Sequence, residues 1–247
     1  MESKFKIPTE TVELPSKGLL YPKDSPLAKG EIEMKYMTAK EEDILTNQNF
    51  IRNGTVIDKL LKSLIVSEGV NYSDLLVGDK NAIMIAARIL AYGPSYSFNW
   101  KGSNVDVDLS EVNNKEIDEA LFKNGNKFNY ALPSGNEVTF KLLNHQDEVA
   151  IDRELAGLKK INKNDSSQVT TRLKRIITSV NGSTEIKDVR EFVDKYMLAT
   201  DARALRKHYS DIQPDADLSF VVNAEDGGEE VIDIPIGIGF FWPDSGE

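Results

Sequence analysis

Three paired segments of alternating apolar and polar residues constrain the fold more than any other feature of this sequence. In each pair, a polar turn that contains glycine separates two segments whose side chains alternate. The pairs are residues 96–100 with 105–109, 128–132 with 138–142, and 218–222 with 232–236. Alternation with period two on both sides of a short turn is typical of an antiparallel β-hairpin. The sequence therefore predicts three hairpins.

Apolar residues at helical spacing fill much of the remaining chain. Thr38 and Glu41 match the capping box of a helix that runs to about Gln48. A second helix is expected from Thr55, and Asp79 is a suitable cap for a third. Four further stripes predict helices between residues 144 and 212: Ile151, Leu155 and Leu158; Leu173, Ile176, Ile177 and Val180; Ile186, Val189, Val193 and Met197; Leu205, His208, Tyr209 and Ile212.

These patterns predict an α+β protein with a mixed N-terminal region that carries β-hairpins, a helical segment and a C-terminal β-hairpin. The expected segments are an extended N-terminal arm at 1–30, a mixed α/β region with two hairpins at 31–143, a helical region at 144–212, and an acidic C-terminal hairpin with an aromatic tail at 213–247. Because the apolar tail follows the helices, we expect the last strands to return to the N-terminal sheet and to complete one continuous domain.

Both ends of the chain carry apolar residues that are expected to need a covering surface. Four prolines lie within the first thirty residues, and they favour an extended arm over a helix. The last apolar stretch contains large aromatic side chains, which are frequent in protein interfaces. The candidate partner-binding residues are Leu14, Pro15, Leu19, Leu20, Tyr21, Phe240, Phe241, Trp242 and Pro243. Burial against the chain's own core and burial against a partner both remain open for these residues.

The net charge of −10 is distributed unevenly. Residues 211–247 contain ten acidic and no basic side chains, whereas residues 153–175 contain seven basic and two acidic ones. Opposite charges on one chain favour intramolecular docking or complementary neighbours in an assembly, with two solvated faces as the alternative. The sequence pI of about 4.9 argues against a nucleic-acid-binding role for the basic stretch.

The composition argues against most enzyme classes and cofactors. The chain has no cysteine and only two histidines, His145 and His208, which we expect to be ordinary solvated side chains. We therefore predict no catalytic, cofactor-binding or metal-binding residues. Glu41 with Glu42 and Glu148 with Asp152 are the carboxylate pairs that a hydrolase would use, and charge on a helix surface explains them more simply.

No targeting or membrane segment is expected. The N-terminus lacks an apolar signal region, and the longest interior apolar stretch, residues 82–87, is far shorter than a membrane span. These features predict a soluble protein that is made in a cytoplasm and does not bind a membrane.

Four short motifs resemble the baseplate hub subunits and hub assembly proteins of T4-like contractile-tailed phages. The motifs are residues 14–22 (Leu-Pro-Ser-Lys-Gly-Leu-Leu-Tyr-Pro), residues 38–42 (Thr-Ala-Lys-Glu-Glu), residues 92–94 (Tyr-Gly-Pro) and residues 240–243 (Phe-Phe-Trp-Pro). The resemblance implies a non-enzymatic component of the tail-assembly pathway whose partners are other hub proteins. It implies a location in the tail baseplate of the virion, and in the host cytoplasm during assembly. An assembly chaperone that leaves the mature virion and a tail-associated cell-wall hydrolase are the alternatives, and the oligomeric state stays open.

Overall fold

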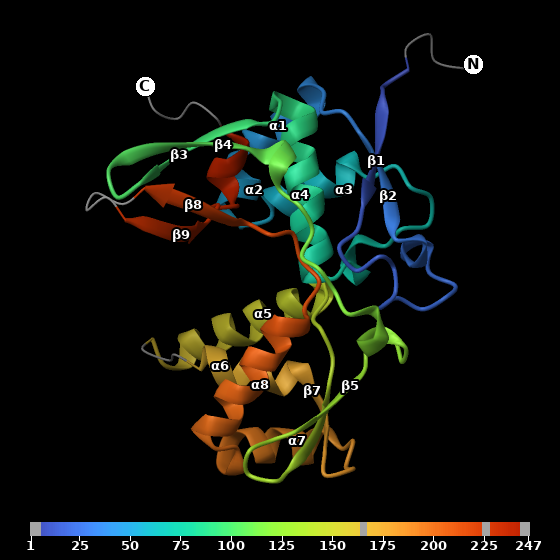
Figure 1. Cartoon of the computed structure of the whole chain (residues 1–247), viewed down its shortest axis with the longest axis vertical. Helices are drawn as coiled ribbons and strands as arrows, with labels where there is room; N and C mark the ends of the chain where they lie inside the picture. The colour runs from blue at the N-terminus through green and yellow to red at the C-terminus, as the bar shows by residue number, and fades with distance from the viewer. Residues whose placement is uncertain (1–5, 164–166, 224–227, 243–247) are drawn as a thin grey trace.

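The chain folds into two lobes, and its C-terminal segment returns to the first of them (Figure 1). The computed structural model describes residues 6–163, 167–223 and 228–242. Of these described residues, those up to about 117 and those from about 217 onward make the first lobe, and those between make the second. Helices and small antiparallel sheets occur in both lobes, which confirms the α+β class.

A central helix organises the first lobe. This helix is α4 (Val77–Tyr92), and its buried side chains lie on several of its faces, as the sequence pattern predicts. The shorter helices α1 (Ala39–Leu45), α2 (Gln48–Arg52) and α3 (Val56–Leu64) precede it. The predicted capping box at the start of α1 is present.

Three two-stranded ribbons complete the first lobe. They are β1 (Thr9–Glu13) with β2 (Glu31–Lys35), β3 (Ser95–Trp100) with β4 (Ser103–Asp108), and β8 (Ser219–Asn223) with β9 (Glu229–Asp233). The first and third predicted hairpins are therefore confirmed. Lys101 and Gly102, in the turn between β3 and β4, both have positive φ, which suits the tight turn of a two-residue hairpin. The short 3₁₀ turns in this lobe are η1 (Pro26–Lys29), η2 (Tyr72–Asp74), η3 (Leu109–Glu111) and η6 (Ile238–Phe241).

The predicted N-terminal arm is integrated into this lobe. Its strand β1 pairs in register with β2, and the following residues fold back through turns so that Leu14 N donates to Gly30 O at 2.8 Å. The described part of this segment, residues 6–30, forms no α-helix, as its prolines predict, but it contains the 3₁₀ turn η1 and folds compactly.

The second lobe is a three-stranded sheet packed with helices. The sheet order is β5 (Phe128–Ala131), β6 (Glu137–Phe140) and β7 (Ile177–Val180), and the second predicted hairpin is confirmed as β5–β6. The helices are α5 (His145–Ile161), α6 (Gln168–Ile176), α7 (Ile186–Glu191), the π-helix η5 (Phe192–Tyr196) and α8 (Ala199–Ile212), and a 3₁₀ turn η4 (Glu119–Phe122) begins the lobe.

Two sequence-based expectations change in this lobe. Residues 177–180, which were assigned to a helical stripe, form a strand because their β-branched run pairs with β6 at the end of α6. The predicted boundary at residue 143 therefore cuts through the lobe, since β6 and β7 lie on opposite sides of it.

The last strands do return to the first lobe, but they form a separate ribbon there instead of joining another sheet.

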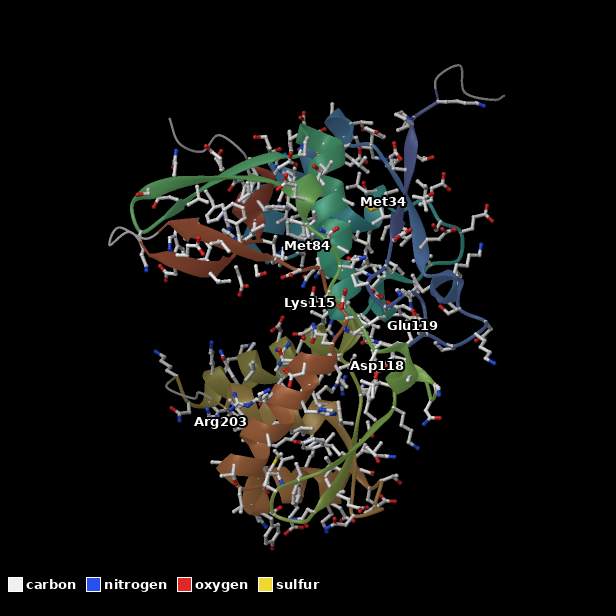
Figure 2. All side chains as sticks on the ribbon, viewed as in Figure 1. Met34, Met84, Lys115, Asp118, Glu119 and Arg203 are labelled. Carbon is white, nitrogen blue, oxygen red and sulfur yellow. The ribbon has the colours of Figure 1, made fainter. Side chains whose placement is uncertain are left out.

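Two antiparallel segments connect the lobes. Lys115 N donates to Asp215 O at 2.8 Å, and Asp217 N donates to Asn113 O at 2.7 Å. Figure 2 places Lys115 at this junction. The returning segment presses against α4, because a Cβ atom on Gly78 would lie 1.8 Å from the carbonyl oxygen of Pro214. Glycine at position 78 therefore permits this close approach.

Candidate functional site

The predicted N-terminal contact residues are mostly buried in the chain's own core. Leu14, Pro15, Leu20 and Tyr21 are buried, and Leu19 is 37% exposed. The four buried side chains are not available to a partner in this structure, so the expectation that they form a binding surface is corrected. Leu19 is the one member of this set that still faces solvent.

A buried carboxylate holds this segment against α4. Asp79 accepts hydrogen bonds from Ser16 N at 2.9 Å, from Ser16 Oγ at 2.7 Å and from Tyr21 Oη at 2.6 Å. Tyr21 Oη in turn accepts a hydrogen bond from Leu76 N at 2.9 Å. Burial raises the pKa of Asp79 and also that of Tyr21. The sequence suggested Asp79 as the cap of α4, but Leu76 occupies the N-cap position of this helix.

The predicted C-terminal contact residues are also packed on the first lobe. Phe240 and Phe241 are 1% and 0% exposed, and the Phe240 ring lies 4.8 Å from that of Tyr96. Trp242 is half-buried against the core, and Pro243 lies outside the described residues. For Phe240 and Phe241 the structure therefore shows self-burial, which is one of the two possibilities left open by the sequence.

An arginine from α4 fixes the position of this terminal segment. Arg88 is 1% exposed, and its Nε donates to Phe240 O at 3.0 Å. Its Nη1 and Nη2 donate to Gly93 O and Ser95 O, each at 3.1 Å. Arg88 therefore joins the C-terminal aromatic residues to the turn that ends α4.

The first carboxylate pair has a structural role. Burial alone would raise the pKa of Glu41, but hydrogen bonds from Lys35, Thr38 and Ser63 outweigh it and lower the pKa to about 2. Glu42 is exposed on α1. Glu41 is thus held as a buried carboxylate by donors from its own lobe.

Glu148 of the second carboxylate pair and the two histidines also occupy packed positions, whereas Asp152 is exposed. Burial raises the pKa of Glu148, which contacts Arg172. His145 is 6% exposed, so the expectation of a solvated side chain is wrong for it, and burial lowers its pKa. Its Nε2 lies 3.4 Å from Asp58 Oδ2. His208 stacks on Tyr130 with a centroid separation of 4.5 Å. Within the described ranges, no group of three or more acidic or histidine side chains is placed to hold a metal ion.

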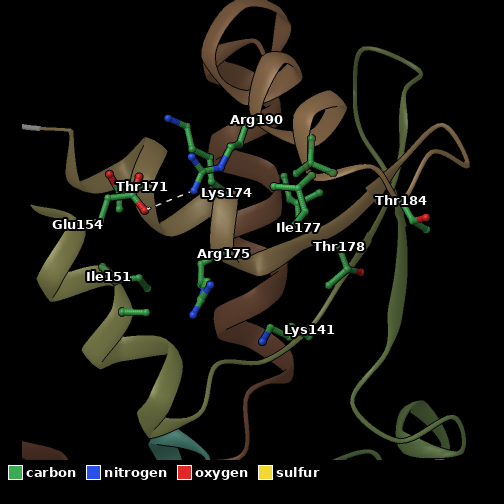
Figure 3. Close-up of a pocket in the computed structure, with 13 residues that line it drawn as sticks. Lys141, Ile151, Glu154, Thr171, Lys174, Arg175, Ile177, Thr178, Thr184 and Arg190 are labelled. Carbon is green, nitrogen blue, oxygen red and sulfur yellow. Dashed lines mark ion pairs between the residues drawn. The ribbon is translucent and has the colours of Figure 1, made fainter.

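A cationic pocket opens on the second lobe between α5, α6, β7 and α7 (Figure 3). Its volume is about 330 Å³. The lining includes four cations, five apolar residues, three threonines and one carboxylate: Lys141, Lys174, Arg175, Arg190; Ala150, Ile151, Ile177, Ile186, Val189; Thr171, Thr178, Thr184; and Glu154. The pocket thus combines apolar walls with a basic rim.

The four cations of this pocket have only three carboxylate partners. Asp147 serves two cations, with Oδ2 at 2.6 Å from Lys141 Nζ and Oδ1 at 3.0 Å from Arg175 Nε. Lys174 Nζ lies 2.6 Å from an oxygen of Asp194. Arg190 and Glu154 are 3.8 Å apart, which is the loose ion pair marked in Figure 3.

Several large apolar side chains are exposed where the sequence analysis did not place a binding surface. On the second lobe Ile186, Tyr196 and Leu198 are 74%, 62% and 55% exposed. On the β8–β9 ribbon Val221 and Val231, which are cross-strand partners, are 53% and 68% exposed. Because side chains alternate along β9, Val231 points to the outer face while Ile232 points inward. Ile186, in contrast, was wrongly assigned to a buried helical stripe.

No family model, no curated protein and no solved structure matches this chain. None of the helices in the described part of the chain is long and apolar enough to span a membrane.

Proposed function

We propose that this chain is a structural or assembly protein of a contractile phage tail, and that it acts in the baseplate hub by binding other tail proteins. The supporting sequence feature is the set of four motifs that resemble hub subunits. In the structure, residues from these motifs hold the first lobe together: Ser16 and Tyr21 bind Asp79, Thr38 binds Glu41, and Gly93 and Phe240 bind Arg88. Because the resembling motifs supply these contacts, the resemblance supports an architecture of the first lobe that is shared with the hub subunits.

The observation that carries a binding role is a set of exposed large apolar side chains on the second lobe. Ile186, Tyr196 and Leu198 come from three consecutive elements, namely α7, η5 and the residue that caps α8. Large apolar side chains that remain in water after folding favour a protein partner that covers them. The π-helix in this region supports the same reading, because such irregular turns occur frequently at functional sites.

Quantitative mass spectrometry of purified tails and of hub assembly intermediates tests this function. A structural subunit is expected in both samples at a fixed ratio to the other hub proteins. An assembly chaperone is expected only in the intermediates. Absence from both samples contradicts a role in the hub.

A cell-wall hydrolase is the competing enzymatic function. One member of each carboxylate pair that would serve it is engaged in an ion pair, Glu41 with Lys35 and Glu148 with Arg172. A peptidoglycan-release assay on the full chain decides this point, since measurable release would replace the binding role with an enzymatic one.

A further inference from the structure

The acidic and basic regions of this chain lie on different lobes. Residues 1–117 and 217–247 contain 25 acidic and 14 basic side chains, whereas residues 118–216 contain 15 acidic and 16 basic ones. The sequence segments that contain the first lobe therefore have a net charge of −11, and the segment that contains the second has a net charge of +1. Figure 1 shows the β8–β9 ribbon on the first lobe and α7 at the far end of the second. Among the described residues, no ion pair joins the β8–β9 ribbon to the basic residues 153–175, and Glu230 of the ribbon pairs instead with Lys101 of the first lobe.

The outer face of the β8–β9 ribbon carries an apolar pair between two carboxylates. Glu229, Val231 and Asp233 alternate with inward residues and are all exposed on one face of β9. Val221 lies opposite Val231 on the neighbouring strand. None of the ion pairs found among the described residues involves Glu229 or Asp233. The face therefore presents two uncovered valines and two unpaired carboxylates.

The pocket on the second lobe has the complementary chemistry. Its walls are apolar, its exposed rim carries Ile186, and its four cations share three carboxylates. Arg190 is 56% exposed and only loosely paired, so it can pair with an incoming carboxylate without losing a strong contact. An apolar side chain flanked by carboxylates would thus meet apolar walls and unbalanced positive charge.

We infer that the α5–α7 pocket binds the outer face of the β8–β9 ribbon of a second copy of this chain. The exposed valines and unpaired carboxylates of the ribbon complement the apolar walls and the excess positive charge of the pocket. The two surfaces differ, so the contact is heterologous and joins copies head to tail. This inference adds a second copy of the chain as one partner to the proposed binding function, but it holds whether or not the protein belongs to a phage tail.

Sedimentation velocity of the full chain at increasing concentration measures this association. We expect a small contact of the transient class, which buries less than roughly 1,200 Å², and therefore self-association in the range of about 10–500 µM. The average mass should rise above the monomer mass of 27.6 kDa with concentration. It should fall again when salt is raised from about 0.05 to 0.5 M, because the rim charges are exposed and screened. A monomer throughout this range overturns the inference.

Two variants identify the surfaces. The pocket variant combines Ile186→Ser with Arg190→Gln, and the ribbon variant is Val231→Lys. All three positions are largely exposed, so both variants are expected to keep the wild-type melting temperature. Each variant alone should stay monomeric. Ile161→Ser, at a position that is 87% exposed and outside both surfaces, is the matched control and should associate like the wild type.

A mixture of the two variants gives the decisive result. The pocket variant keeps an intact ribbon, and the ribbon variant keeps an intact pocket, so an equimolar mixture should form one-to-one dimers and no larger species. If the mixture stays monomeric, or if either variant alone associates like the wild type, the assigned pairing of pocket and ribbon is wrong. The census of tail proteins described above is independent of this result, so either proposal can fail while the other stands.

Discussion

Replacing Tyr21 with phenylalanine should destabilise the first lobe far more than the loss of one hydroxyl at the surface would. In the wild type, Tyr21 Oη donates to the buried Asp79 carboxylate at 2.6 Å and accepts from Leu76 N at 2.9 Å. Tyr21 is 8% exposed and Asp79 is 0% exposed, so water does not readily replace either bond. A typical hydrogen bond contributes about 0.5–1.5 kcal/mol, and a buried N–H left without a partner costs about 1–3 kcal/mol.

We therefore expect Tyr21→Phe to lower the free energy of unfolding by about 3 kcal/mol, which corresponds to a fall in Tm of about 6–12 °C for a chain of this size. Urea denaturation followed by circular dichroism measures the loss. Hydrogen exchange of the Leu76 amide reports the broken bond directly, because this amide should exchange faster than its neighbours do.

Tyr36→Phe is the matched control. The Tyr36 hydroxyl bonds Glu10 at 3.1 Å in an exposed position, so its removal should cost less than about 0.5 kcal/mol. If Tyr21→Phe is no more destabilising than Tyr36→Phe, the buried network does not anchor the N-terminal segment.

Three further predictions concern other buried groups. Glu41→Gln should cost on the order of 3 kcal/mol near pH 7 in urea titrations. This difference should vanish toward pH 2, because the lowered pKa of about 2 means that the contribution of Glu41 is present above its ordinary pKa and is lost on acidification. Glu42→Gln, at an exposed position of the same helix, is the control and should leave the free energy of unfolding near pH 7 unchanged. The lowered pKa of His145 makes the unfolded chain bind protons more readily, so wild-type stability should fall from pH 7 to 5 more steeply than that of His145→Gln, and equal slopes would contradict this. Phe240→Ala should cost about 3–5 kcal/mol in urea unfolding, and a loss below about 1 kcal/mol would show that the C-terminal segment is not part of the core.

Local structure could be predicted from the sequence wherever one signal dominated. Alternation around glycine-containing turns located all three hairpins, and the Thr38–Glu41 box located the start of α1. The strand β7 was missed because Ile177 and Val180 also fit a helical stripe, and only their pairing with β6 resolves the ambiguity. Pairing between strands that are far apart in the sequence leaves no mark in a local pattern.

The candidate binding surface was harder to predict than the fold. Apolar residues near both ends suggested interface anchors, but sequence does not distinguish an aromatic residue covered by a partner from one covered by its own chain. In the structure, Phe240 is covered by its own chain, and Arg88, about 150 residues earlier, donates a hydrogen bond to its carbonyl oxygen. A contact between residues so far apart cannot be predicted from a local sequence pattern. The exposed Ile186 was hidden by the opposite error, because it shares helical spacing with the buried Val189.

The most direct test of the binding role compares two variants for their binding to purified hub proteins. The first variant combines Tyr196→Ser with Leu198→Ser and removes exposed apolar side chains of the second lobe. The second variant, Ile161→Ser, is the control and removes a similarly exposed side chain elsewhere. We predict that the first variant keeps the wild-type Tm but loses binding to the hub proteins, while the second keeps both. Binding that is unchanged in the first variant, or absent in the wild type, would contradict the proposal that this protein works through its exposed apolar surfaces.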